Sequence, residues 1–199
     1  MTNLKPFLFN GIFIFLFFIA ACAPKVKPVE IPEYKGTLES FLAENAVWEG
    51  LSGSFNLNLT RPDRQVQSAD AFIDTGPGRL EMRFYKLGFP AGELVEGDPR
   101  YDDLKEAIRS GLIWWQMGDF RATSLEHEYL IETETRSLVL DRKTLVPLSQ
   151  SLISSRGIVN ISYSDYRRLE TLWYPYKMEI KYSGYELELT GGKIELKHN

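Results

Sequence analysis

From Trp48 onward the chain alternates apolar and polar residues with a period of two, the pattern of a strand with one buried face. The stretch from Leu51 to Thr60 is the clearest case, because apolar positions and serine, asparagine or threonine follow one another almost without interruption. Similar patterns predict strands at residues 66–74, 79–86, 93–96, 128–134, 137–141, 148–155, 158–166, 176–182, 185–190 and 193–197. These strands indicate an antiparallel sheet with one apolar and one polar face.

Turn residues separate most of the predicted strands. Glycine and proline mark the turns at residues 61–64 and 75–78, and short links typical of hairpins stand at 156–157, 183–184 and 191–192. Between Lys86 and Gly92 we expect a longer loop with Leu87 and Phe89 beside two glycines, and these side chains are either exposed to solvent or tucked back under the sheet edge.

Two segments have helical spacing instead. Thr37 can cap a helix in which Leu38, Phe41 and Leu42 share one face. A second helix is predicted from Asp98-Pro99 to Gly111. Residues 112–117 are apolar and of ambiguous type, and on a strand only one of Trp114 and Trp115 would face inward. The predicted fold class is α+β, a curved antiparallel sheet that forms an incomplete barrel, with helices covering its open side.

The first residues form a separate apolar segment. Lys5 precedes the stretch FLFNGIFIFLFFIAA at residues 7–21, which is shorter than the roughly 20 apolar residues of a membrane-spanning helix. The tetrapeptide Ile19-Ala20-Ala21-Cys22 resembles the bacterial lipobox, in which the cysteine receives a diacylglyceryl thioether. Cys22 is the only cysteine, so no disulfide can form within the chain. We predict Cys22 as a lipid anchor, and an ordinary signal peptide with a chance cysteine is the alternative.

These observations divide the chain into three predicted parts: a lipoprotein signal peptide at 1–21, a lipidated, proline-rich tether at 22–36, and a folded domain at 37–199. By the enterobacterial sorting rule, an aspartate after the cysteine favours retention in the inner membrane. Here Ala23 follows it. The sequence therefore predicts an outer-membrane protein whose domain faces the periplasm.

Composition and motifs argue against several other functions. The formal net charge of −4 and the lack of a basic patch argue against nucleic-acid binding. His127 would point away from its neighbours Glu126 and Glu128 on a strand, which is a poor geometry for a metal site. Neither a G-x-S-x-G motif nor a glycine-rich phosphate loop is present. We therefore expect no enzyme, no cofactor and no metal.

Several segments, taken in order, resemble the LolA/LolB superfamily of periplasmic lipoprotein carriers and receptors. They are WEGLSGSF at residues 48–55, RLEMRFYKLG at 79–88, LDRKTLVPL at 140–148, and VNISYSDY at 159–166 followed by YPYKMEI at 174–180. The resemblance covers about residues 45–197, and it implies a half-barrel with a helical lid around a cavity for acyl chains. Cys22 makes the lipid-anchored member the better match, whereas the longer loop with Phe89-Pro90 departs from the family.

The resemblance implies an anchored protein that binds acyl chains and accepts or inserts lipoproteins at the outer membrane, with a soluble periplasmic carrier as a partner. It also implies that the loop at Leu87 and Phe89 inserts into the membrane or guides acyl chains out of the cavity. The predicted cavity lining, which fits a plain core equally well, comprises Phe55, Leu57, Leu59, Leu80, Met82, Phe84 and Trp114. The alternative function is a lipid-binding or structural envelope lipoprotein without lipoprotein transfer.

Overall fold

The computed structural model describes residues 29–86, 88–94, 102–154 and 157–198, and for residues 89–94 it describes the backbone alone. Residues 31–199 form one compact unit.

Two helices lie in the described ranges. Helix α2 (Leu38–Asn45) begins at the predicted cap, because Ser40 N donates to Thr37 Oγ1 at 3.2 Å and Thr37 N donates to Ser40 Oγ at 2.9 Å. Helix α3 (Asp102–Leu112) ends one residue beyond the predicted Gly111. Its expected start at residues 98–99 lies outside the described residues.

Eleven described strands pair into one antiparallel sheet in the order β4-β3-β2-β1-β11-β10-β9-β8-β7-β6-β5. They are β1 (Trp48–Thr60), β2 (Val66–Gly76), β3 (Arg79–Lys86), β4 (Phe89–Leu94), β5 (Arg121–Ser124), β6 (Glu128–Glu132), β7 (Arg136–Asp141), β8 (Pro147–Ser154), β9 (Gly157–Leu169), β10 (Leu172–Tyr182) and β11 (Tyr185–His198). The short edge strand β5 has no counterpart among the predicted strands.

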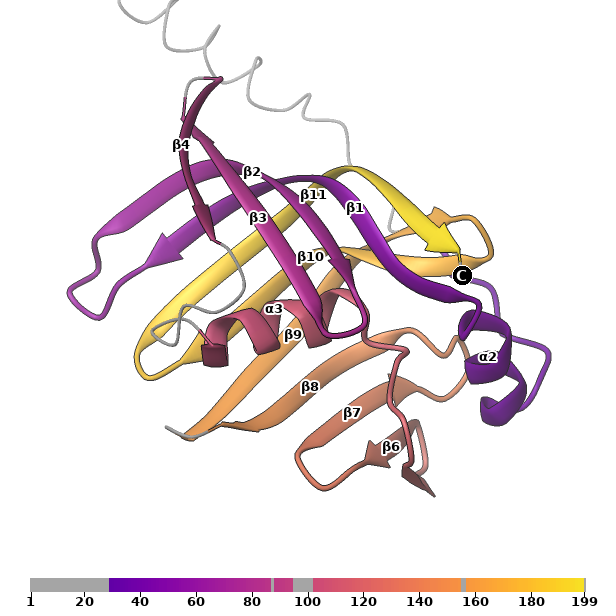
Figure 1. Cartoon of the computed structure of the whole chain (residues 1–199). Helices are drawn as coiled ribbons and strands as arrows, with labels where there is room; N and C mark the ends of the chain where they lie inside the picture. The colour runs from indigo at the N-terminus through magenta and orange to yellow at the C-terminus, as the bar shows by residue number, and fades with distance from the viewer. Residues whose placement is uncertain (1–28, 87, 95–101, 155–156, 199) are drawn as a thin grey trace, which may run out of the picture. The chain divides into compact units, whose positions relative to one another are not determined.

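The first and last strands pair in the middle of the sheet, with Leu57 opposite Leu189. Strands β4 and β5 are the two free edges of the sheet, so it stays open. Figure 1 shows the sheet curving around α3, which lies between β3 and β8. The predicted curved, open antiparallel sheet with two helices is confirmed.

The predicted loop from Lys86 to Gly92 is wrong in length. Lys86 pairs directly with Phe89, so the chain reverses within two residues and β4 begins at once. Gly88 takes the positive φ of 80° that such a tight hairpin requires. Leu87 lies outside the described residues, and the side chain of Phe89 is not described.

The predicted hairpin at Gly191-Gly192 is also wrong, because residues 185–198 form the single strand β11. The register between β11 and β1 shifts next to these glycines. A Cβ on Gly192 would lie 2.7 Å from Ser54 Oγ on β1. The glycines therefore permit a close approach of two strands at an irregularity, which local sequence does not distinguish from a turn.

Because each hairpin reverses the chain, the turns gather at two opposite ends of the sheet. We call one the tether end: it holds α2, the start of β1 and the turns β2–β3, β7–β8 and β9–β10. The other is the hairpin-tip end, with the turns β1–β2, β3–β4, β8–β9 and β10–β11. Figure 1 shows α2 and the end of β11 on one side, and the β1–β2 and β10–β11 tips on the other.

The outer face of the central strands carries exposed ion pairs. Nζ atoms of Lys177, Lys181 and Lys197 lie 2.6 Å from Glu188, 2.7 Å from Glu186 and 2.6 Å from Asp74, respectively. Such pairs contribute little stability each. These ion pairs show that the outer face of the sheet is in contact with water. The buried apolar residues of the same strands lie on the opposite, inner face.

Candidate functional site

The inner face of the sheet carries the residues that were predicted to line an acyl cavity. They belong to one apolar cluster built from β1, β3 and the turn after α3. Five of them are buried, namely Phe55, Leu57, Leu80, Met82 and Trp114, and two are partly buried, namely Leu59 and Phe84. The fold brings all seven together, and their contact with an acyl chain stays a prediction.

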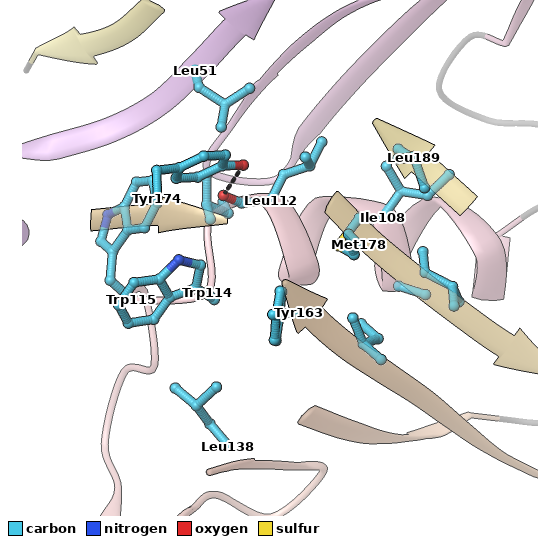
Figure 2. Packing of buried hydrophobic residues seen from close by; sticks show 14 of the residues in the cluster. Leu51, Ile108, Leu112, Trp114, Trp115, Leu138, Tyr163, Tyr174, Met178 and Leu189 are labelled. Atoms are coloured by element: carbon cyan, nitrogen blue, oxygen red, sulfur yellow. Dashed lines mark hydrogen bonds between the residues drawn. The ribbon is translucent and has the colours of Figure 1, made fainter. Parts of the chain in front are cut away.

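Helix α3 occupies the space against this inner face. Its buried residues Ile108, Gly111 and Leu112 face the sheet, and the helix contacts β2, β3, β8, β9 and β10. A Cβ on Gly111 would lie 2.4 Å from Met178 Sδ, so a larger residue here would require the Met178 side chain on β10 to shift. Tyr174 Oη donates to the Leu112 carbonyl at 3.0 Å, as Figure 2 shows. A helix therefore fills this part of the apolar interior.

Trp114 and Trp115 are both buried, with exposed fractions of 0% and 3%. The expectation that only one of them faces inward is wrong, because they lie in the turn after α3 and not on a strand. Their rings meet edge to face with centroids 5.8 Å apart, and Trp115 also packs edge to face on Tyr174 at 6.3 Å. The pair links the end of α3 to the sheet (Figure 2).

Arg136 on β7 ties the end of α3 to the sheet. Its guanidinium donates to the carbonyl oxygens of Ser110 at 3.0 Å and of Trp114 and Gln116 at 2.8 Å each. Burial lowers the pKa of Arg136 to about 10. The carbonyls at a helix C-terminus carry partial negative charge, which offsets part of the cost of burying this cation.

Gln150 and Tyr163 complete this polar cluster inside the sheet. Arg136 Nη2 and Tyr163 Oη donate to Gln150 Oε1 at 3.0 and 2.9 Å. Because arginine can only donate, the orientation of the Gln150 amide is fixed. Burial raises the pKa of Tyr163, so its hydroxyl stays protonated. The sequence analysis missed these three residues, since polar residues at inward strand positions give no distinctive local signal.

A groove opens at the tether end between α2, the β2–β3 turn and residues 115–120. We call it the α2 groove. Its volume of about 560 Å³ falls within the roughly 300–1,000 Å³ of small-molecule sites. Glu39 and Glu49 also border it. Its apolar lining comprises Leu42, Ala43, Ala46, Pro77, Trp115, Met117 and Phe120.

The wall of the α2 groove is held by hydrogen bonds to the start of β1. Trp115 Nε1 donates to the Trp48 carbonyl at 3.0 Å, and Gln116 Nε2 donates to the Glu49 carbonyl at 2.7 Å. Phe120 lines the groove with 38% of its surface exposed. Trp115 and Leu42 are lining residues that the sequence analysis names, although it assigns neither to a groove, and an aromatic residue at position 120 soon after Gly118 was a signal that could have pointed here.

The chain that precedes α2 is held against the domain at the same end. Tyr34 N donates to the Lys143 carbonyl in the β7–β8 turn at 2.8 Å. The Tyr34 ring packs edge to face on Phe41 of α2, with centroids 5.2 Å apart. The described chain just before α2 is therefore fixed to the domain at Tyr34, at the tether end.

The described residues contain no group of three or more histidine, cysteine, aspartate or glutamate side chains suited to a metal. His127 is exposed in the β5–β6 turn, with Nε2 3.5 Å from Glu126 Oε1. Across the ranges that the structure covers, neither helix is long and apolar enough to cross a membrane.

Solved structures share this fold. A LolA superfamily protein from Nitrosomonas europaea has a TM-score of 0.55 and 11% identity, over 82% of this chain and 95% of that chain. A DUF1329 family protein from Desulfovibrio piger has a TM-score of 0.54 and 11% identity, over 79% and 90%. A candidate outer membrane lipoprotein-sorting protein domain from Vibrio parahaemolyticus has a TM-score of 0.52 and 10% identity, over 80% and 90%.

The chain thus has a LolA/LolB-like fold, as its sequence resemblance predicts. At such low identity, the likeness concerns the fold. No protein-family model and no curated protein sequence matches the chain.

Proposed function

We propose that this protein is a lipid-anchored envelope protein that binds acyl chains and accepts or inserts lipoproteins at the outer membrane. The observation that carries the proposal is the apolar inner face of an open sheet, against which α3 packs. The names of two structural neighbours, a LolA superfamily protein and a candidate lipoprotein-sorting domain, support the same role.

In the proposed mechanism, helices α2 and α3 cover the open side of the half-barrel, and acyl chains compete with α3 for the inner face. Burying each methylene contributes about 0.8 kcal/mol, so several chain segments can offset the contacts that α3 loses. A bilayer offers the same burial, and release into it is therefore close to neutral. The exchange needs no covalent step, so we propose that the protein is not an enzyme.

The proposed anchor is Cys22, and the motivation is the small residues Ala20 and Ala21 before it. Two or three acyl chains make a stable anchor, whereas one chain gives only marginal attachment. Ala23 after the cysteine supports the outer membrane as the location. A soluble periplasmic carrier would then deliver the cargo.

The sequence predicts that the loop at Leu87 and Phe89 inserts into the membrane or guides acyl chains out of the cavity, and this proposal gives the β3–β4 turn a related step, the arrival of cargo. Strands β3 and β4 place the turn between Lys86 and Phe89 at the hairpin-tip end. We propose that Leu87 and Phe89 guide acyl chains there when cargo arrives from a carrier.

Chain-length dependence of binding tests this function. The soluble chain from residue 29 onward would be titrated with fluorescent fatty acids of increasing length. At about 0.8 kcal/mol per methylene, each added methylene should strengthen binding roughly fourfold until the site is filled. Absence of saturable binding, or affinity independent of chain length, would refute acyl-chain binding.

The alternative, a lipid-binding or structural envelope lipoprotein of the same fold without lipoprotein transfer, is favoured by one observation: α3 and Trp114 already fill this part of the interior. Transfer of an acylated peptide from the bound state into vesicles separates the two functions. Binding without transfer supports the alternative.

A further inference from the structure

At the tether end, the chain that precedes α2 is held in a fixed position on the domain. Tyr34 is held by its backbone hydrogen bond to Lys143 and by its ring contact with Phe41. Its hydroxyl also lies 3.3 Å from Ser40 Oγ on α2. The point where the tether leaves the domain is therefore set by the fold.

The length of the tether limits which end can approach the membrane. From Cys22 to Tyr34 the chain can span at most about 40 Å, since an extended residue covers roughly 3.3–3.6 Å. Strand β1 has 13 residues. At roughly 3.3 Å per residue it is about as long as the whole tether. Bringing the hairpin-tip end to the bilayer would require the tether to run fully extended along the sheet, which is entropically costly.

Apolar surface and an open hollow coincide at the tether end. Phe120 at the α2 groove is 38% exposed, and Val47 beside α2 is 49% exposed. Trp115 forms the inner wall of the groove and contacts Trp114, whose ring stacks 6.0 Å from Phe41. The groove thus lies next to the apolar core, from which the Trp115 ring separates it.

From these observations we propose that the tether end faces the bilayer, with Val47 and Phe120 in contact with lipid, and that the α2 groove admits an acyl chain from that bilayer. The proposal rests on the proposed function, because it assumes both the anchor at Cys22 and acyl-chain binding. Its occupant is an acyl chain, since most of the lining is apolar and Val47 and Phe120 are exposed beside it, with the carboxylates of Glu39 and Glu49 at its border.

Site-specific labels in the full-length lipidated chain test the orientation. Acylation would block Cys22, the only cysteine, so one new cysteine reports one position. A polarity-sensitive dye on Val47→Cys or Phe120→Cys should sense lipid and be quenched by a bilayer-embedded quencher in phosphatidylethanolamine–phosphatidylglycerol vesicles. The matched control is Ile153→Cys at the hairpin-tip end, where the side chain is 66% exposed. Its dye should report water.

Blocking the groove tests the passage of the acyl chain. Ala43 is exposed on α2 and lines the groove, so Ala43→Trp fills the groove without entering the core. Losing the burial of about two methylenes should weaken uptake of a fluorescent long-chain fatty acid from vesicles about tenfold. The control Ala122→Trp adds the same side chain at an exposed position of β5, and uptake should be unchanged. Equal thermal stability of both variants excludes unfolding as the cause.

The outcomes separate this inference from the proposed function. Equal quenching at Val47, Phe120 and Ile153, or stronger quenching at Ile153, would overturn the orientation. Wild-type uptake by Ala43→Trp would overturn the groove as the entry. If the wild-type chain takes up no fatty acid while the labels still report lipid at the tether end, acyl binding fails and the orientation stands.

Discussion

The two ends of the sheet are built in different ways. At the tether end, Tyr34 is joined to α2 by a ring contact and to the β7–β8 turn by a hydrogen bond, and the α2 groove opens on another side of α2. At the hairpin-tip end, Ile153 and Ile158 face each other across the β8–β9 hairpin with 66% and 62% of their surfaces exposed. The comparison teaches that one end is shaped by long-range contacts and the other by local turns.

This difference suggests that the two ends of the sheet contact different partners. The tether end fixes the chain at Tyr34 and carries an apolar groove, which suits contact with the bilayer that holds the anchor. The hairpin-tip end presents exposed aliphatic side chains at the ends of strands, which suits transient contact with a delivered partner. The following predictions test this difference, from the largest expected effect to the smallest.

Removing the anchor should have the largest effect, because it releases the tether end from the membrane. Cys22→Ala removes the thiol that would receive the diacylglyceryl group, so the chain should lose all lipidation and remain an unprocessed precursor. Metabolic labelling with palmitate and intact mass measure both properties. A variant that is still cleaved and acylated would contradict the predicted anchor.

Arg136→Met should destabilise the helix that runs between the two ends. It leaves the buried carbonyls of Ser110, Trp114 and Gln116 without their charged donor, which should cost about 2–4 kcal/mol of unfolding free energy. Denaturant titration of the soluble chain measures the change.

The matched control is Arg109→Met, which changes an arginine of α3 itself. Arg109 forms an ion pair with Glu106 at 2.7 Å near the surface, and its loss should cost about 0.5 kcal/mol or less. Equal losses for the two variants would show that Arg136 does not hold α3 in the way its geometry implies.

The double variant Leu87→Glu, Phe89→Glu addresses the hairpin-tip end. We expect normal folding and unchanged uptake of fatty acid, because the turn is remote from the α2 groove. Transfer of an acylated peptide from a carrier should slow several-fold, because contact with an acyl chain would strip water from the two carboxylates, which is costly. Wild-type transfer would remove the proposed role of the turn, and a dye on Phe120→Cys that loses its lipid signal in this background would reverse the assignment of the two ends.

The smallest effect concerns the turn that receives the tether. Burial alone would raise the pKa of Asp141, but hydrogen bonds from Thr144 at 2.8 Å and from Lys143 at 3.0 Å leave this pKa below its ordinary value of 3.8. Because the folded pKa is the lower one, the carboxylate stabilises the fold above the unfolded pKa, and this contribution is lost as pH falls through the folded pKa.

Acid titration of the Thr144 and Tyr34 amide shifts by NMR should therefore give a common midpoint below 3.8. The transition should disappear in Asp141→Asn, which can still accept a hydrogen bond but does not titrate. A midpoint at or above the ordinary value would contradict the link between this turn and the tether.

Much of the fold could be predicted from local sequence. Alternation along Leu51–Thr60 determined a strand with one apolar face, and Thr37 determined the start of α2 through a capping box with Ser40. These features depend on neighbours within a few residues, so their signals survive in the bare sequence. The order of the segments that resemble the LolA/LolB superfamily then indicated the architecture.

The tertiary structure alone decided the pairing of β1 with β11, the position of α3 against the inner face and the α2 groove. The two glycines 191 and 192 illustrate the limit, because a close approach to β1 and a hairpin turn require the same small residues. Arg136 and Trp115 gained their roles from partners that are 20 or more residues away. No local pattern records such contacts, since they arise only when distant strands and helices are brought together in the folded chain.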